Sequence, residues 1–315
     1  MRLILNQHEQ ISAPHPPHLL NTFVPLLSHY KAEDPTSLGN LVEDMCQWVE
    51  ANPVSWTDVS LSREKILKNS SSIFDIFEQI YLAKAVADKS EFWCCKSTFN
   101  IQYVEKLEKR IKPFYIHLYR DGRDVAASFK KVVVGPKHAY HLAVQWHEEQ
   151  LLSLEFLNGI EERKIHISYE SLLDHPKVVA TDICNKLGID YSDDMLLYYT
   201  SEESKHTAES GRMWESVTKP IIRDNHDKFP NELTSEEIQI FEQVAGDTLK
   251  AFNYKLTQPE DSKMFLDIDE YNILNQEYIK EWKSKISKDK LNRMDQKRLL
   301  EVIRKRLDVP FTQAT

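Results

Sequence analysis

The sequence has few cysteines and no long apolar run. Four cysteines occur in 315 residues, two of them adjacent at positions 94 and 95, and none belongs to a Cys-x-x-Cys pair. This usage excludes the disulfide framework of small secreted domains and fits a reducing compartment. No apolar stretch approaches the roughly 20 residues of a membrane span, and residues 6–10 are too polar for a signal peptide. We therefore expect a soluble, cytoplasmic protein without a transmembrane segment.

Negative charge predominates outside one segment. The formal net charge is −9, although residues 280–306 contain eleven Lys and Arg against four Asp and Glu. An acidic body does not attract nucleic acid, so we expect no nucleic-acid partner. An anionic ligand must instead be held by a local set of converging donors, which suits a small phosphorylated cofactor.

Helical and strand patterns alternate over most of the chain. Apolar residues recur at spacings of three and four, as in amphipathic helices, and short β-rich runs separate them. Strands that alternate with helices favour an α/β fold with a parallel sheet flanked by helices. Cys46 and Cys184 fall at core positions. We predict helices over residues 38–50, 73–87, 101–111, 138–158 and 176–187, and strands over 92–95, 115–119 and 164–169.

The C-terminal segment differs from the rest in composition. We assign residues 1–256 to one domain and residues 257–315 to a charged helical extension, with Pro259–Asp261 as a linker. The positive charge could favour an acidic partner or an anionic membrane surface, but charge runs are usually solvated faces, so we assign the extension no chemistry. Two apolar helix faces are expected to dock, one formed by Tyr271, Leu274, Tyr278, Trp282 and Ile286, the other by Leu299, Val302, Ile303 and Leu307.

Residues 114–128 predict an anion-binding site. They read as an apolar strand that ends at Arg120, an Asp-Gly turn, and a helix that carries Ser128. Ligands of open α/β sheets bind at the carboxyl ends of strands, beside helix N-termini that favour anions. Arg120 offers a planar fork of donors that matches phosphate oxygens. The structural alternative is that Arg120 pairs with Asp121 or Asp124 and that Ser128 caps a helix turn.

This motif resembles the 3′-phosphate-binding motif of the sulfotransferase family, in which a serine follows eight residues after an arginine at a strand end. Further segments resemble the family between about residue 5 and residue 254. They are Leu5–Ile11, Cys95–Thr98 (with Thr98 in place of a proline), Ser168–Leu173, Lys186–Ile189, Lys219-Pro220 and Lys228-Phe229. The resemblance implies a P-loop-NTPase-like fold and sulfuryl transfer from 3′-phosphoadenosine 5′-phosphosulfate to a hydroxyl or amine acceptor.

The resemblance also implies a role for each matched residue. Positioning and electrostatics carry most of the rate in such a transfer, by analogy with phosphoryl transfer. Structural alternatives remain, since Lys96 could be a solvated lysine at a strand end and Tyr169 a core tyrosine. Lys228 has Trp214, Arg223 and His226 as nearby alternatives. The implied roles are the 3′-phosphate for Arg120 and Ser128, adenine packing for Tyr169, the nucleotide phosphates for Lys228, and the leaving group for Lys96.

The general base does not follow from the resemblance. Some family members carry a glutamate after the segment that matches Leu5–Ile11, and this chain has none there. Histidine titrates near neutrality, so His15 is the candidate base and His18 the reserve. Alternatively, both are ordered parts of a proline-rich loop. We expect no metal at His8, His15 and His18, because the family requires none and no cysteine or carboxylate clusters with them.

One family feature is missing from the sequence. Members open with a strand and a Gly-x-x-Arg-Ser-Gly-Thr-Thr loop that binds the 5′-phosphosulfate through backbone N–H groups. Met1–Leu5 aligns with the helix after that loop, so the first strand and loop are expected to be absent. Either the start codon is placed too far downstream, or the chain is a degenerate homologue that is inactive as written.

Two rival functions are considered. A nucleoside or small-molecule kinase would share the fold, but its GxxxxGK[ST] motif does not occur in the sequence. A catalytically dead sulfotransferase-like protein could instead bind a nucleotide or act as a scaffold. The acceptor, a small molecule or a glycan, is not specified by residues 12–37, 53–72 and 196–216. The oligomeric state stays open, with a homo-oligomer among the alternatives.

Overall fold

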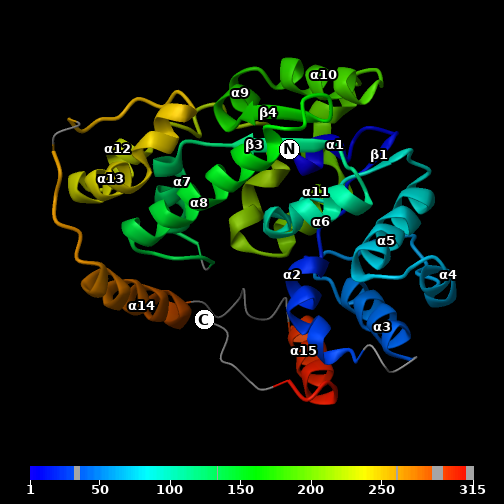
Figure 1. The fold of residues 1–315 in the computed structure, drawn as a ribbon. Helices are drawn as coiled ribbons and strands as arrows, with labels where there is room; N and C mark the ends of the chain where they lie inside the picture. The colour runs from blue at the N-terminus through cyan, green and yellow to red at the C-terminus, as the bar shows by residue number, and fades with distance from the viewer. Residues whose placement is uncertain (32–35, 133, 260–261, 286–293, 310–315) are drawn as a thin grey trace. The chain divides into compact units, whose positions relative to one another are not determined.

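The chain folds into two compact units. The computed structural model describes residues 1–31, 36–132, 134–259, 262–285 and 294–309 (Figure 1). The first unit comprises Met1–Pro113, Tyr191–Pro220 and Lys288–Thr315, and the second comprises Phe114–Asp190 and Ile221–Ser287. Each unit therefore draws on segments that are far apart in the sequence.

The first unit is mainly helical and contains one small parallel sheet. Strands β1 (Ile11–Ser12) and β2 (Phe92–Trp93) pair in parallel, with Ile11 opposite Phe92. Its other elements are α1 (Arg2–Leu5), α2 (Leu19–Phe23), η1 (Val24–His29), α3 (Ser37–Glu50), α4 (Arg63–Lys68), α5 (Ile73–Asp88), η2 (Thr98–Tyr103), α6 (Val104–Arg110), η3 (Asp193–Thr200), α11 (Glu202–Glu209), η4 (Arg212–Thr218) and α15 (Met294–Arg306), where η marks a 3₁₀ helix.

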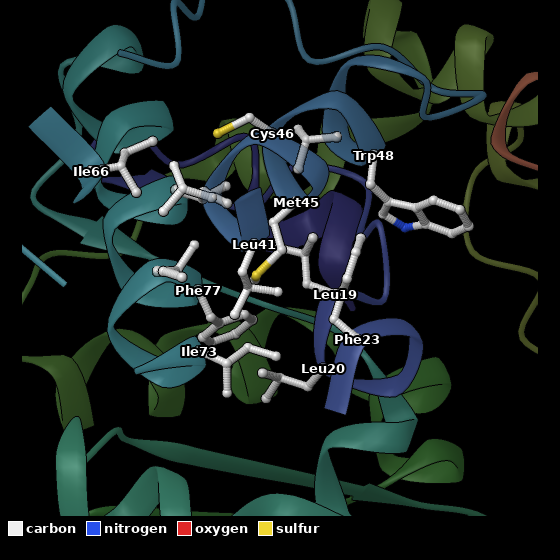
Figure 2. Packing of buried hydrophobic residues seen from close by; sticks show 14 of the residues in the cluster. Leu19, Leu20, Phe23, Leu41, Met45, Cys46, Trp48, Ile66, Ile73 and Phe77 are labelled. Atoms are coloured by element: carbon white, nitrogen blue, oxygen red, sulfur yellow. The ribbon is translucent and has the colours of Figure 1, made fainter. Parts of the chain in front are cut away.

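The core of the first unit is built by α2, α3 and α5. Phe23, Met45 and Ile76 are fully buried in one apolar cluster, and Figure 2 shows Phe23 and Met45 among their neighbours. The same cluster contains Ile303 of α15, which is 2% exposed. Helix α15 thus packs on the apolar face of the helices that precede it by about 250 residues in the chain.

The second unit is built on two parallel strands with helices around them. β3 (Tyr115–Tyr119) pairs with β4 (Lys164–Ser168) in register from Tyr115 opposite Lys164 to Tyr119 opposite Ser168. Its helices are α7 (Gly122–Phe129), α8 (Ala139–Leu157), α9 (Tyr169–Asp174), α10 (Pro176–Leu187), α12 (Phe229–Glu232), α13 (Ser235–Ala251) and α14 (Ile268–Lys285).

Helix α7 begins where Asp121 caps it. The Asp121 carboxylate accepts from the Arg123 backbone N–H at 2.9 Å, which satisfies one of the unpaired donors at a helix start. The buried Arg123 guanidinium also pairs with Asp121 and with Glu242 of α13. Gly122 allows close packing here, since a Cβ at this position would lie 2.5 Å from the Trp146 ring of α8. The turn between β3 and α7 is therefore fixed by a cap, an ion-pair network and a glycine.

Most of the predicted elements are confirmed. Helices α3, α5, α8 and α10 and strands β3 and β4 match their predicted ranges within one residue, and both strand pairs are parallel. The predicted helix over 101–111 begins as the 3₁₀ helix η2. The predicted strand over 92–95 is wrong beyond Trp93, because its partner β1 runs into Pro14, which has no N–H to continue the pairing. Strand β1 was not predicted, because two residues are too short to show a pattern.

The C-terminal segment packs through fewer residues than its pattern predicts. Tyr271 and Ile303 are buried as expected, but Val302 is 65% exposed. On α15 the neighbours of Ile303 at a spacing of four, Leu299 and Leu307, complete the packed face, and Val302 lies about 100° away around the helix. Ile286 and most of the predicted linker lie outside the described residues. The division at residue 256 stays a prediction. None of the described helices has the length and apolar composition of a membrane span.

Candidate functional site

Arg120 lies directly after β3, at the carboxyl end of the strand. Its Nη2 donates to Asp124 Oδ2 at 3.1 Å and to the Asn225 carbonyl oxygen at 2.9 Å. The side chain is 18% exposed, and its Nε is buried without a hydrogen-bond partner in the described part of the chain. Buried donors are rarely left unpaired. The guanidinium therefore keeps donor capacity that the described residues do not use.

Asn225 connects three of the predicted site residues. Besides accepting from Arg120, it donates through Nδ2 to the Tyr169 hydroxyl at 2.9 Å, and its Oδ1 accepts from Lys228 Nζ at 2.9 Å. The Arg120 guanidinium also lies over the Tyr169 ring, 4.7 Å from its centroid, as in a cation–π contact. The structure thus brings Arg120, Tyr169 and Lys228 together around one asparagine, Arg120 at its backbone carbonyl oxygen and the other two at its side-chain amide.

Asp124 is the buried residue that supports this cluster. It is 1% exposed, and its Oδ1 accepts from the backbone N–H groups of Lys228 and Phe229, both at 2.8 Å. Its Oδ2 accepts from Arg120, so the arginine does pair with Asp124, as the structural alternative predicted, while it also makes its other contacts. Because Oδ1 accepts from the backbone and Oδ2 accepts from Arg120, Asp124 holds the Lys228 segment against α7 and orients Arg120 at the same time.

Ser128 lies on the same face of α7 as Asp124, about one turn further along the helix. The two residues are four positions apart on α7, and side chains at this spacing project from the same face. The residue is exposed. No hydrogen bond joins Ser128 to Arg120, Tyr169 or Lys228.

The alternatives to Lys228 lie elsewhere or are otherwise engaged. His226 contacts Asp227 at 2.8 Å and Asp174 at 3.6 Å, and the hydrogen bond to Asp227 is the main cause that raises the pKa of His226. Arg223 is exposed. Trp214 belongs to the first unit, where its ring meets that of His15 edge to face.

Lys96 belongs to the first unit, three residues after β2. Desolvation of its ammonium group, and secondarily the charge of Arg2, lower the pKa of Lys96, although the residue as a whole is exposed to solvent. Arg2 is held by the Ala13 carbonyl oxygen at 3.0 Å, by Glu203 at 2.6 Å and by Thr207 at 2.9 Å. A lysine whose pKa is lowered is a better proton donor toward developing negative charge.

The two candidate bases differ in their surroundings. His15 is 6% exposed, and its Nδ1 lies 3.3 Å from Asn52 Nδ2. The Nδ1 of His18 lies 2.9 Å from the Ser97 hydroxyl, which follows Lys96 in the chain. His18 also adopts a left-handed backbone conformation with φ of 54°, which is uncommon for a residue other than glycine. Of the two histidines, His18 is therefore the one that contacts the residue next to the candidate catalytic lysine.

Sequence reasoning missed Asp124 and Asn225. The sequence indicates Asp124 only as a partner of Arg120 and gives no sign of a role for Asn225. Their roles come from contacts across about 100 residues of sequence, for which a single sequence carries no local signal. Within the described residues, no group of three His, Cys, Asp or Glu side chains is arranged to hold a metal ion.

The geometry defines an α/β protein with a cluster of Arg120, Tyr169 and Lys228 at the end of a parallel strand. A model of the sulfotransferase family matches residues 1–193, and the chain belongs to this family. The match includes Lys96, Arg120, Ser128 and Tyr169 but not Lys228. The search of curated proteins gives no match.

Two solved sulfotransferase domains share the fold. The sulfotransferase domain from the Synechococcus PCC 7002 olefin synthase is 19% identical with a TM-score of 0.53, over 78% of this chain and 88% of that one. The sulfotransferase domain from the curacin biosynthetic pathway is 20% identical with a TM-score of 0.52, over 81% of this chain and 93% of that one. At these identities the similarity establishes the α/β sulfotransferase fold and not the substrate.

Proposed function

We propose that the chain is a sulfotransferase that moves a sulfuryl group from 3′-phosphoadenosine 5′-phosphosulfate to a hydroxyl or amine acceptor. The observation that carries the proposal is the cluster around Asn225, in which the buried Nε of Arg120 has no partner among the described residues and lies beside Tyr169 and Lys228. A guanidinium and an ammonium can bind phosphate oxygens, and an aromatic ring can pack on adenine, so the three groups suit a phosphorylated adenosine. The residues present therefore fit the 3′-phosphoadenosine part of the donor.

Each residue has a distinct part in the proposal. Arg120 and Ser128 bind the 3′-phosphate, Tyr169 packs on adenine and Lys228 adds positive charge. The donor supplies the activated sulfuryl group. Lys96 stabilises the charge on the leaving phosphate, and its lowered pKa suits that role. His15 remains the candidate base and His18 the reserve, so that one of them accepts the acceptor's proton. The cysteine usage suits a reducing compartment such as the cytoplasm.

Calorimetry with 3′-phosphoadenosine 5′-phosphate tests the binding part. Hydrogen bonds to a charged group contribute about 1.5–3 kcal/mol, so Arg120→Ala should weaken binding by roughly tenfold to a hundredfold. Lys177→Ala, which removes an exposed cation of the same unit, is the matched control and should bind like the wild type. A flat thermogram for correctly folded wild-type protein would refute the proposal.

A transfer assay with labelled donor and a panel of hydroxyl and amine acceptors tests the chemical part. Lys96→Ala should lower kcat. His15→Ala and His18→Ala are compared to identify the base: the variant in which the activity no longer depends on pH is the one that lacks it. If Lys96→Ala turns over like the wild type, the assigned role is wrong. Nucleotide binding without transfer to any acceptor would instead favour the catalytically inactive scaffold.

A further inference from the structure

A small cavity in the first unit is lined by uncharged groups. Its volume is about 160 Å³, and it lies between α2, α3, η2 and α15. The lining contains two aromatic rings, three amide side chains and a histidine, together with a proline and a threonine. The residues used below are Trp48, Phe99, Asn21, Asn52, Gln296 and His18.

The cavity is next to the candidate catalytic residues of this unit. His18 forms part of its wall and contacts Ser97, the residue after Lys96. Asn52, on another wall, lies 3.3 Å from the Nδ1 of His15. A group bound in this cavity therefore lies against the reserve base and one contact away from the other candidate.

Two buried amides leave their oxygens available as acceptors. Asn52 Nδ2 donates to the Val54 carbonyl oxygen at 2.8 Å, and Gln296 Nε2 donates to the Trp48 carbonyl oxygen at 3.2 Å. Both side chains are 5% exposed, and neither amide oxygen has a hydrogen-bond partner within the described residues. An amide oxygen accepts a hydrogen bond from a hydroxyl group and repels an anion. These two oxygens favour a ligand that carries hydrogen-bond donors, such as hydroxyl groups.

The lining excludes charged ligands. It contains no Asp, Glu, Lys or Arg, so a buried carboxylate, sulfate or ammonium would lose its hydration without gaining a partner of opposite charge. The larger cavity of this unit, of about 330 Å³, differs in this respect because Lys84, Asp88 and Glu203 are among its lining residues. The smaller cavity is below the 300–1,000 Å³ typical of sites for whole drug-sized ligands, so it suits a single ring.

Several hydrogen-bonding groups beside aromatic rings favour a sugar over a phenol. A phenol carries one hydroxyl group and would leave most of the amide groups unpaired, whereas a neutral sugar ring carries several hydroxyl groups and an apolar face for an aromatic ring. The indole N–H of Trp48 donates a hydrogen bond to the Pro17 carbonyl oxygen at 2.7 Å. Its ring is thereby fixed as an apolar wall.

The C-terminal helix completes this wall. Gln296 comes from α15, which is anchored on α3 through buried Ile303 and through the ion pair between Arg306 and Asp44. The helix therefore places an amide beside residues that precede it by more than 240 positions.

We propose that this cavity binds an uncharged sugar ring and that α15 forms one wall of this acceptor site. The assignment of the sugar as acceptor rests on the sulfuryl-transfer function proposed above. Binding of the sugar to the cavity does not depend on that function and can be measured separately.

The test uses the full-length protein and methyl glycosides of neutral hexoses (gluco, galacto and manno), with methyl glucuronoside and methyl glucosaminide as charged counterparts. Saturation-transfer NMR should detect at least one neutral glycoside and neither charged one. Gln296→Ala and Phe99→Ala should each weaken that binding by about threefold to tenfold, since each removes one contact. Gln276→Ala, at an exposed position of α14, should have no effect.

Phe99 is 41% exposed, so Phe99→Ala provides a second test if Gln296→Ala fails to fold. Absence of binding by every neutral glycoside, binding of the charged glycosides at equal strength, or unchanged binding in both variants overturns the proposal. Calorimetry with 3′-phosphoadenosine 5′-phosphate on the same samples separates the two ideas. Nucleotide binding without sugar binding overturns the cavity assignment alone, and sugar binding without nucleotide binding overturns the transfer function alone.

Discussion

Replacing Asp124 tests whether one buried carboxylate organises the nucleotide cluster. Asp124→Ala removes three hydrogen bonds at once, those from the backbone N–H groups of Lys228 and Phe229 and that from Arg120. The buried Phe229 N–H would be left unpaired at a cost of about 1–3 kcal/mol. The half-buried Lys228 N–H and the lost ion pair add to this, and we expect a total loss of about 3–5 kcal/mol.

Asp124→Asn should be milder. The asparagine Oδ1 can still accept from both backbone N–H groups but does not pair with the charge of Arg120, so a loss of about 1–2 kcal/mol is expected. Asp224→Ala is the matched control, because that carboxylate is exposed on the same segment, and surface substitutions usually change stability by less than about 0.5 kcal/mol.

Hydrogen exchange measured by mass spectrometry is the direct assay. A local loss of about 3 kcal/mol corresponds to roughly a hundredfold faster exchange of the Lys228 and Phe229 amides when exchange proceeds by local opening. Urea unfolding gives the accompanying change in global stability. If exchange over residues 225–232 is the same in Asp124→Ala and Asp224→Ala, Asp124 does not hold this segment and the reasoning fails.

Three further outcomes are expected. Gly122→Ala should lose about 1–3 kcal/mol by urea unfolding because its Cβ would meet Trp146 at 2.5 Å, whereas Gly159→Ala, with nothing within 4 Å, should change little; equal effects would contradict the packing argument. Burial lowers the pKa of His117 to about 4, so the unfolded state, with a pKa near 6.5, binds the proton first as pH falls. Stability should therefore decline between about pH 6.5 and pH 4, by up to about 3 kcal/mol, and a His117→Gln variant that shows the same decline would refute this. Burial raises the pKa of all four thiols, to about 11 or 12 for three of them; at pH 8 those three should be alkylated on the order of a hundredfold more slowly in the native protein than in urea, and labelling at equal rates would show that burial does not protect them.

The elements around the site follow closely from the sequence. The run from Tyr115 to Tyr119 predicts a strand that the structure contains with the same limits, because alternation and β-rich composition are local properties. Asp121 and Gly122 predict the turn for the same reason, since capping and close packing act on the residues that carry them. A resemblance between short motifs was then sufficient to predict the family, which the family match confirms.

The predictions failed where a property depends on partners distant in sequence. Strand β2 stops early because Pro14 lies opposite its continuation, about 80 residues away. Val302 is exposed because only the face of α15 around Ile303 packs on the core. In the sequence, an apolar residue beside that face looks the same as an apolar residue within it. Neither outcome is encoded in the segment itself.

By itself, the sequence determined the order of the main strands and helices, the arginine at the strand end and the family. Only the tertiary structure decided that Asn225 joins Arg120, Tyr169 and Lys228, and that α15 supplies Gln296 to a cavity beside His18. The physical reason is the range of the interactions. Propensity, capping and periodicity act within about one turn of chain, whereas hydrogen bonds and cavity walls form between segments that only folding brings into contact.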